Sequence, residues 1–242
     1  MARRRRRGSS KSRLLVGAAV IVVVVAGLAL GVVDIEGLTG GGGGGNAALT
    51  TGTSGAGSPS EASDALATLE VEPEGSMSGY SRDEFPHWSG ADEFGWEAPD
   101  SSCDTRDASL IRDGDAVEVG ESCDIESGEW LDPYAGETIT DSSSVDIDHI
   151  VPLANAWRSG ADEWDEPLRE EFANAQINLL STDPGENRSK GDRGPETWRP
   201  TDEGAWCDYS ARWVSVKSEY ELSVNEGEKA ALEETLATCE AG

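Results

Sequence analysis

One histidine of this sequence lies where it could support phosphodiester hydrolysis. His149 follows Asp148 in a strand-like run, residues 145–151, and Pro152 comes directly after that run. A neutral imidazole can take the proton of an attacking water while a divalent cation stabilises the leaving oxygen. We therefore expect His149 to be the general base. Because adjacent strand residues face opposite ways, Asp148 and His149 can share a site only if the strand ends or bulges there.

Oxygen-bearing side chains on two consecutive segments could hold the cation. Mg²⁺ prefers oxygen ligands and keeps several waters, so two protein ligands can suffice. We expect Asp148 and Asn187 to be these ligands for Mg²⁺ or another divalent ion such as Mn²⁺, with Asp146 as the rival of Asp148. Asn187 could instead be a plain helix cap. Zinc is disfavoured, because the sequence has no CxxC spacing and two histidines in all.

Several short motifs resemble a known family of nucleases. They are Asp-His-Ile-Val-Pro at 148–152, Asn-Leu-Leu at 178–180 and Asn-x-x-Lys-Gly-Asp at 187–192. This set resembles the HNH, or His-Me finger, endonucleases, and most closely exported members related to the C-terminal domain of GmrSD-type restriction endonucleases. The resemblance extends from about residue 80 to residue 239 and includes further motifs at 103–106, 132–136 and 172–174. It implies a ββα-metal core and metal-dependent DNA cleavage.

The same resemblance implies roles for three further residues. Asn178 would organise the loop that follows the base and orient the base itself. Lys190, together with Arg188, would contact a phosphate of the substrate, although both could equally pair with the abundant acidic residues. His87 is expected to be a solvated or core histidine. The tryptophans are expected mainly in the core, and Trp157 and Trp198 are the two to test as base-stacking platforms.

Charge is divided unevenly along the chain. Seven of the 19 Lys and Arg residues precede residue 14, whereas all 47 Asp and Glu residues follow residue 33. The part after residue 33 therefore has 12 basic and 47 acidic residues, a formal charge of −35. This charge repels nucleic acid at long range and argues against a generic polyanion-binding module. A nuclease with such a surface must rely on a bound metal to receive a phosphate.

The N-terminal third predicts a membrane or export segment followed by a linker. Residues 1–13 form a basic tail, and residues 14–33 contain no charge, enough apolar helix to span roughly 30 Å. We expect a transmembrane anchor with a cytoplasmic tail and an extracellular C-terminal domain. Secretion after signal cleavage is the alternative. Residues 34–75 are predicted to be a flexible Gly/Ser-rich linker, which could include a short helix around residues 63–69.

The C-terminal region, residues 76–242, is predicted to be one α+β domain with a ββα-metal core, additional helices and short strands. Strands are expected at 116–119, 129–131, 138–140, 145–151 and 177–181, and helices at 154–160, 166–175, 206–220 and 225–239. Four cysteines fit two disulfides in an exported domain and allow three pairings. Pairing of nearest neighbours, Cys103 with Cys123 and Cys207 with Cys239, is favoured because each bridge closes a local loop.

These features predict a metal-dependent endonuclease that acts outside the cytoplasm. The substrate would be DNA, with RNA as a further candidate, and little sequence preference is expected because no helix-turn-helix, zinc finger or long basic stretch is present in the domain. One alternative is a catalytically weak cell-surface binding protein of the same fold. Another is a toxin-like nuclease effector. The sequence identifies no protein partner.

Overall fold

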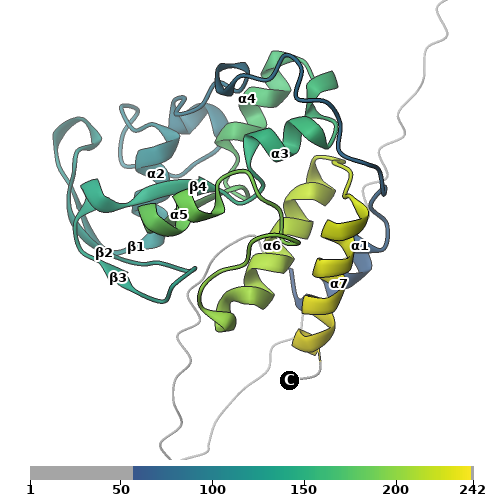
Figure 1. Cartoon of the computed structure of the whole chain (residues 1–242). Coiled ribbons are helices and arrows are strands. Elements are labelled where there is room, and N and C mark those ends of the chain that lie inside the picture. The colour runs from purple at the N-terminus through teal and green to yellow at the C-terminus, as the bar shows by residue number, and fades with distance from the viewer. Residues whose placement is uncertain (1–56, 241–242) are drawn as a thin grey trace, which may run out of the picture. The chain divides into compact units, whose positions relative to one another are not determined.

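The chain contains both helices and short strands, and the strands β1 to β4 follow one another along the sequence, in agreement with the α+β prediction (Figure 1). The computed structural model describes residues 57–240. Its α-helices are α1 (Pro59–Leu66), α2 (Thr105–Asp113), α3 (Leu153–Arg158), α4 (Glu166–Asn174), α5 (Pro184–Lys190), α6 (Trp206–Glu219) and α7 (Glu226–Glu240). Its strands are β1 (Gly114–Val119), β2 (Ile125–Leu131), β3 (Thr138–Ile139), β4 (Asp146–His149) and β5 (Leu179–Thr182). The α+β class is thus confirmed, whereas α2 was not predicted.

The predictions for residues 1–13 and 14–33, and for the linker up to residue 56, fall outside the described residues. Within residues 57–240, no helix combines the length and the apolar character needed to cross a membrane.

The folded domain begins before residue 76, because α1 belongs to it. Ser58 caps this helix in a reciprocal box with Glu61, whose carboxylate accepts a hydrogen bond from the Ser58 amide at 2.7 Å. Ala62 and Leu66 are buried in a core that α6 and α7 also line, and the three helices lie side by side (Figure 1). The predicted linker therefore extends too far toward the C-terminus. The polar composition of this segment gave no sign that Ala62 and Leu66 are buried.

A three-stranded antiparallel sheet, β1-β2-β3, packs against α2. Trp130 on β2 is buried, and its indole N–H donates to the Leu110 carbonyl of α2 at 2.8 Å. Gly114 begins β1 directly opposite Trp130, and a Cβ there would lie 2.6 Å from the indole nitrogen. Glycine at position 114 therefore leaves room for the indole, whose hydrogen bond to Leu110 connects the sheet to α2.

The second sheet has two strands, and its register is unbroken. β4 and β5 are antiparallel, with Asp148 opposite Leu180 and His149 opposite Leu179. Helices α3 and α4 lie between the two strands in sequence, and α5 follows β5 directly. Asp183 caps α5 by accepting hydrogen bonds from the Gly185 and Glu186 amides. The paired strands β4 and β5 and the helix α5 thus surround the end of β4 where His149 lies, although α3 and α4 separate the two strands in sequence.

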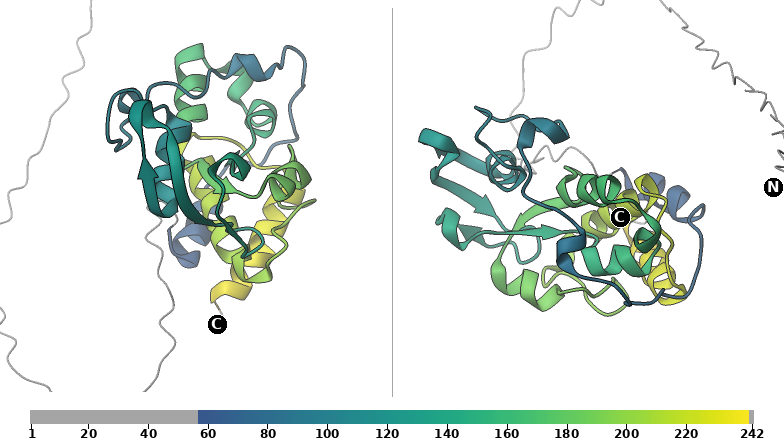
Figure 2. Two further views of the ribbon diagram at one scale, coloured as in Figure 1. Left: turned by 90° about the vertical axis from the view of Figure 1, so that its left-hand side faces the viewer. Right: turned by 90° about the horizontal axis from the view of Figure 1, so that it is seen from above.

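Two hydrophobic cores lie on either side of this two-stranded sheet. Leu180 and Ile150 belong to the core of α1, α3, α4, α6 and α7, whereas Ile147 and Leu179 belong to the core of α2 and the three-stranded sheet. Figure 2 shows the sheet and the α6–α7 pair at opposite ends of the described residues. The two-stranded sheet that carries His149 is therefore packed on both faces, which restricts its movement.

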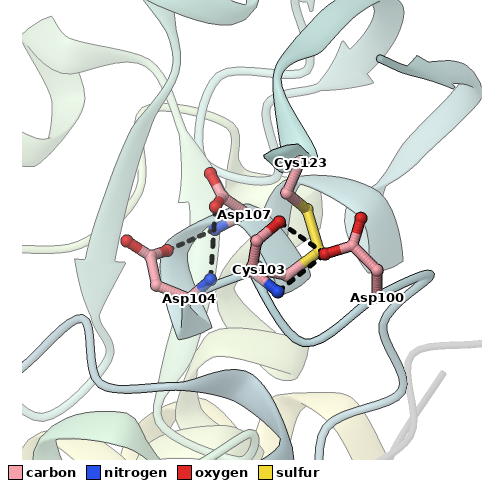
Figure 3. Close-up of a disulfide and its surroundings, with 6 residues drawn as sticks. Asp100, Cys103, Asp104, Asp107 and Cys123 are labelled. Atoms are coloured by element: carbon pink, nitrogen blue, oxygen red, sulfur yellow. Dashed lines mark hydrogen bonds between the residues drawn. A yellow bond between two sulfur atoms is a disulfide. The ribbon is translucent and has the colours of Figure 1, made fainter. Parts of the chain in front are cut away.

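Both disulfides have the predicted nearest-neighbour pairing. Cys103 is bonded to Cys123, and Cys207 to Cys239. Figure 3 shows the first bridge beside the start of α2, where Asp104 and Asp107 form a reciprocal capping box. The second bridge joins the first turn of α6 to the last turn of α7. Each bridge closes a loop around one end of the domain, as the spacing indicated.

Candidate functional site

His149 lies at the end of β4 with its ring held in one orientation. The side chain is 5% exposed, and its Nε2–H donates to the Ala173 carbonyl at the end of α4, at 2.9 Å. Because a carbonyl can only accept, the proton is on Nε2 and the lone pair is on Nδ1. Burial lowers the pKa of His149 to about 3. The imidazole is therefore neutral at physiological pH and has one nitrogen free to accept a proton.

The free energy of unfolding should fall as the pH drops below about 6.5, the ordinary pKa of histidine. Between that value and about 3, the unfolded chain takes up a proton at His149 and the folded chain does not. The stabilisation is complete above pH 6.5 and is lost progressively toward pH 3. Urea unfolding at pH 4 to 7 should show a shallower pH dependence for His149→Asn. Equal slopes for both proteins would contradict a buried neutral imidazole.

Asn178 fixes the chain directly after the base. It is fully buried, its Oδ1 accepts from the Val151 amide at 2.9 Å, and its Nδ2 donates to the Val151 carbonyl at 3.4 Å. Its own carbonyl accepts from the Ile150 amide at 2.8 Å. These contacts suit the expected role of organising the loop after His149. The Asn178 side chain bonds to backbone here, so its influence on the base acts through residues 150 and 151.

Asp148 and Lys190 form a buried ion pair. The Lys190 ammonium is fully buried and lies 2.9 and 2.8 Å from the two carboxylate oxygens of Asp148, and 2.8 Å from the His149 carbonyl. The Tyr134 hydroxyl donates to Asp148 Oδ2 at 2.7 Å. Burial raises the pKa of the Asp148 carboxyl and lowers that of Lys190, and each charge opposes the shift of the other. All three ammonium donors are thus used inside the protein, away from any surface phosphate.

Tyr134 owes its position to the Asp-Pro-Tyr-x-Gly motif. Asp132, which is fully buried, accepts from the backbone amides of Tyr134, Ala135 and Asp183 and from the Thr182 hydroxyl. Gly136, at φ 71°, closes the turn by donating to the Asp132 carbonyl. The Asp132 carboxylate therefore connects the turn at Tyr134 to the start of α5. Because Tyr134 and Lys190 of α5 are the two partners of Asp148, the positions of both depend on Asp132.

Asp148 and His149 have separate surroundings. Asp148 contacts Tyr134 and Lys190, whereas the His149 ring lies beside Ala173 and the ring of Trp88. This agrees with opposite orientations of neighbouring strand residues. β4 ends at His149 as expected, but the side chains of Asp148 and His149 contact different residues and share none.

Asp146 and Asn187 lie close together on β4 and α5. Both are partly buried, and the Asn187 Nδ2 donates to Asp146 Oδ2 at 3.4 Å. Arg188, the next residue, is exposed, and its side chain makes no hydrogen bond or ion pair with another residue of the range 57–240. No cluster of three or more His, Cys, Asp and Glu residues able to hold a metal exists among these described residues. A magnesium site with two oxygen ligands needs no such cluster.

Three residues near the base were not predicted. The Trp88 ring lies 6.0 Å from the His149 ring, the His87 ring lies 6.4 Å from it, and the Arg82 Nε donates to His87 Nε2 at 3.4 Å. Trp157 and Trp198, by contrast, are each 7% exposed and belong to the core of the helices. No local spacing links a segment at 82–88 with residue 149. The one sequence feature that could have pointed to this segment is the adjacent pair of aromatic residues His87 and Trp88, which precedes Cys103.

Comparison with known proteins identifies similar sequences. The sequence model of a family described as GmrSD restriction endonucleases, C-terminal domain, matches residues 108–235. A protein of Arthroderma benhamiae, named an uncharacterized secreted protein, is 47% identical over 184 residues, which make up 75% of this chain and 86% of that protein. No solved structure matches the chain. The span matched by the family model contains His149, Asn178, Asn187 and Lys190, whereas residues 82–88 precede it.

Proposed function

Because the chain belongs to the family of GmrSD restriction endonuclease C-terminal domains, we propose that it is a metal-dependent endonuclease. It hydrolyses phosphodiester bonds in DNA, with RNA as a further candidate, and with little sequence preference. The observation that carries this proposal is His149, a buried neutral imidazole with Nε2 fixed by Ala173 and Nδ1 left free. An attacking water hydrogen-bonded to Nδ1 would pass its proton there as its oxygen bonds to phosphorus.

A divalent cation, Mg²⁺ or Mn²⁺, would supply charge stabilisation of the leaving oxygen. Asp146 and Asn187 fit it best, because both side chains offer oxygens and lie within 3.4 Å of each other. Asp148, the ligand expected from the motif, fits less well, because the Lys190 ammonium already neutralises it. The order β4, β5, α5 supports a ββα-metal core for this part of the domain.

We place the activity outside the cytoplasm. Two disulfides are typical of exported domains, and the fungal relative is named a secreted protein. Residues 14–33 would anchor the chain in the membrane or direct its secretion. Arg188, which is exposed, would contact the phosphate backbone of the substrate.

The test is cleavage of plasmid DNA by the full chain with its disulfides intact, in Mg²⁺ or Mn²⁺, at low and at molar salt. Cleavage that EDTA stops is expected. Asn187→Ala and Asp146→Asn should each raise the Mg²⁺ concentration needed for half-maximal rate by at least about tenfold. Loss of a residue that only supports a metal ligand typically lowers metal affinity by about 10- to 100-fold, and loss of a ligand should cost no less. Asn225→Ala, which changes a helix-cap asparagine of α7, is the matched control and should leave this concentration unchanged.

Other outcomes would redirect the proposal. If Asp148→Asn raises the metal requirement and Asp146→Asn does not, Asp148 is the ligand and Lys190 must leave it when the cation binds. Absence of cleavage under every metal and salt condition would favour the cell-surface binding protein instead.

A further inference from the structure

The rings of His87 and Trp88 lie beside the His149 ring, and Asp148 contacts neither of them. The Trp88 and His149 ring centroids are 6.0 Å apart, with 34° between the ring planes. His87 lies edge-on to both, 5.2 Å from Trp88 and 6.4 Å from His149. Trp88 is partly exposed, unlike the tryptophans of the core. The neighbourhood of His149 therefore includes a tryptophan that can be reached from solvent.

The segment that carries Trp88 is hydrogen-bonded to the C-terminal end of α4, the same helix end that holds the His149 ring. The Asn174 side chain accepts from the Ser89 amide at 3.1 Å and donates to the Pro86 carbonyl at 3.0 Å. Ala173, its neighbour on α4, supplies the carbonyl that holds His149. Ala173 and Asn174, in the last turn of α4, thus position both the His149 ring and the loop that carries Trp88.

The backbone of Trp88 is strained. Its φ is 61°, in the left-handed region that a bulky residue rarely adopts. Such a conformation is unfavourable and persists only where the surrounding structure enforces it, as at functional sites. Glycine would remove this strain but would also remove the ring next to His149. The hydrogen bonds of Asn174 on either side of Trp88 account for how the strain is maintained.

Arg82 adds a positive charge beside these rings. It is exposed, and its Nε donates to His87 Nε2, while His87 Nδ1 donates to the Phe85 carbonyl at 2.8 Å. No carboxylate of the described residues is within ion-pair distance of the Arg82 guanidinium. In a chain of net charge −28, an exposed arginine without an acidic partner is available to a phosphate.

We propose that Arg82 and Trp88, with His87 as the bridge between them, bind the substrate next to the scissile bond. Trp88 would stack on a nucleobase and Arg82 would contact a backbone phosphate. A base can stack on a protein ring only when it is free of its own neighbours, so the preferred substrate is single-stranded nucleic acid. Stacking tolerates any base, which agrees with cleavage that has little sequence preference. This inference rests on the proposed function and names its substrate class.

Binding in EDTA separates this inference from catalysis. The anisotropy of a labelled single-stranded oligonucleotide and of the same sequence in a duplex is measured with the full chain at low salt. The wild type should bind the single strand more tightly. Trp88→Ala should weaken that binding about 5- to 150-fold, the range expected for loss of one stacked base, and should leave duplex binding nearly unchanged. Trp88→Phe should recover most of the affinity.

Two further variants keep the test decisive. Trp88→Gly relieves the backbone strain, so it should fold at least as well as Trp88→Ala and still lose the stacking. Arg82→Ala should weaken binding and make it less dependent on salt, whereas Arg82→Lys should retain the salt dependence. Arg199 and Trp206, a cation–π pair at 5.1 Å elsewhere in the domain, provide matched controls, and alanine at either should not change affinity.

Equal affinity of the wild type for single strand and duplex would overturn the inference, as would unchanged single-strand binding in Trp88→Gly. If single-strand binding behaves as expected but no metal supports cleavage, the proposed function fails and the binding site stands. If DNA is cleaved but Trp88 variants bind and cleave like the wild type, the nuclease stands and this inference fails.

Discussion

Replacing His149 by asparagine should lower the rate constant for DNA cleavage by about 10²–10⁴-fold, the usual contribution of a general base. Asparagine is smaller than histidine and fits the same space, but its amide corresponds to Nδ1 rather than to the Nε2 that donates to Ala173, and it cannot accept a proton from water. Substrate binding in EDTA should stay within a few-fold of the wild type. Single-turnover cleavage of a labelled oligonucleotide in saturating Mg²⁺ measures the rate, and near-ultraviolet circular dichroism checks that the fold is retained.

The low basicity of His149 gives this prediction a second readout. Burial holds its pKa near 3 in the free protein, which makes it a weak base there. A phosphate anion bound beside the ring would favour the imidazolium and raise that pKa. The acidic limb of the pH profile should therefore lie at higher pH for kcat, which reports the complex, than for kcat/KM, which reports the free enzyme. Cleavage by His149→Asn at the wild-type rate would eliminate His149 as the base.

The sequence was sufficient for most of the elements near His149. The alternation of residues 145–151 predicted β4, and helical spacing predicted α6 and α7 to within a residue or two. These patterns are local, because they reflect which side of an element faces a core. The disulfide pairing was also predictable, since each bridge closes a short stretch of chain.

The partners of the site residues were not predictable from such patterns. The carbonyl that holds His149 belongs to Ala173, and any residue type could supply a carbonyl. Trp88 reaches the base from 61 positions earlier in the chain, through hydrogen bonds that Asn174 makes. For the same reason α1 was assigned to the linker, because its two buried residues contact helices more than 100 positions away.

The Asp148–Lys190 pair shows how one motif permits two electrostatic arrangements. A buried carboxylate needs a positive partner, and a metal ion or an ammonium group can provide it. The motif contains both the carboxylate and the lysine, so residue types alone leave the choice open. In the structure the lysine is the partner, and it is as deeply buried as the aromatic core.

Replacing Lys190 by methionine should therefore destabilise the domain by about 3–5 kcal/mol, because it leaves the Asp148 charge buried without a counter-charge. Methionine keeps the apolar part of the side chain, so the packing changes little. The ammonium partly opposes the rise that burial causes in the pKa of Asp148, so without it that pKa would lie still further above its value in the unfolded chain. The folded state must then take up a proton, so the loss of stability should be larger at pH 8 than at pH 5.

The double variant Asp148→Asn, Lys190→Met isolates the pair. An asparagine at 148 can still accept from the Tyr134 hydroxyl and needs no counter-charge. The double variant should therefore be more stable than Lys190→Met alone, and it should lose the pH dependence that the single variant gains. Urea unfolding of the full chain with its disulfides intact measures both quantities. If the two substitutions instead destabilise additively, with no pH dependence in Lys190→Met, the ammonium is not the partner that keeps Asp148 charged.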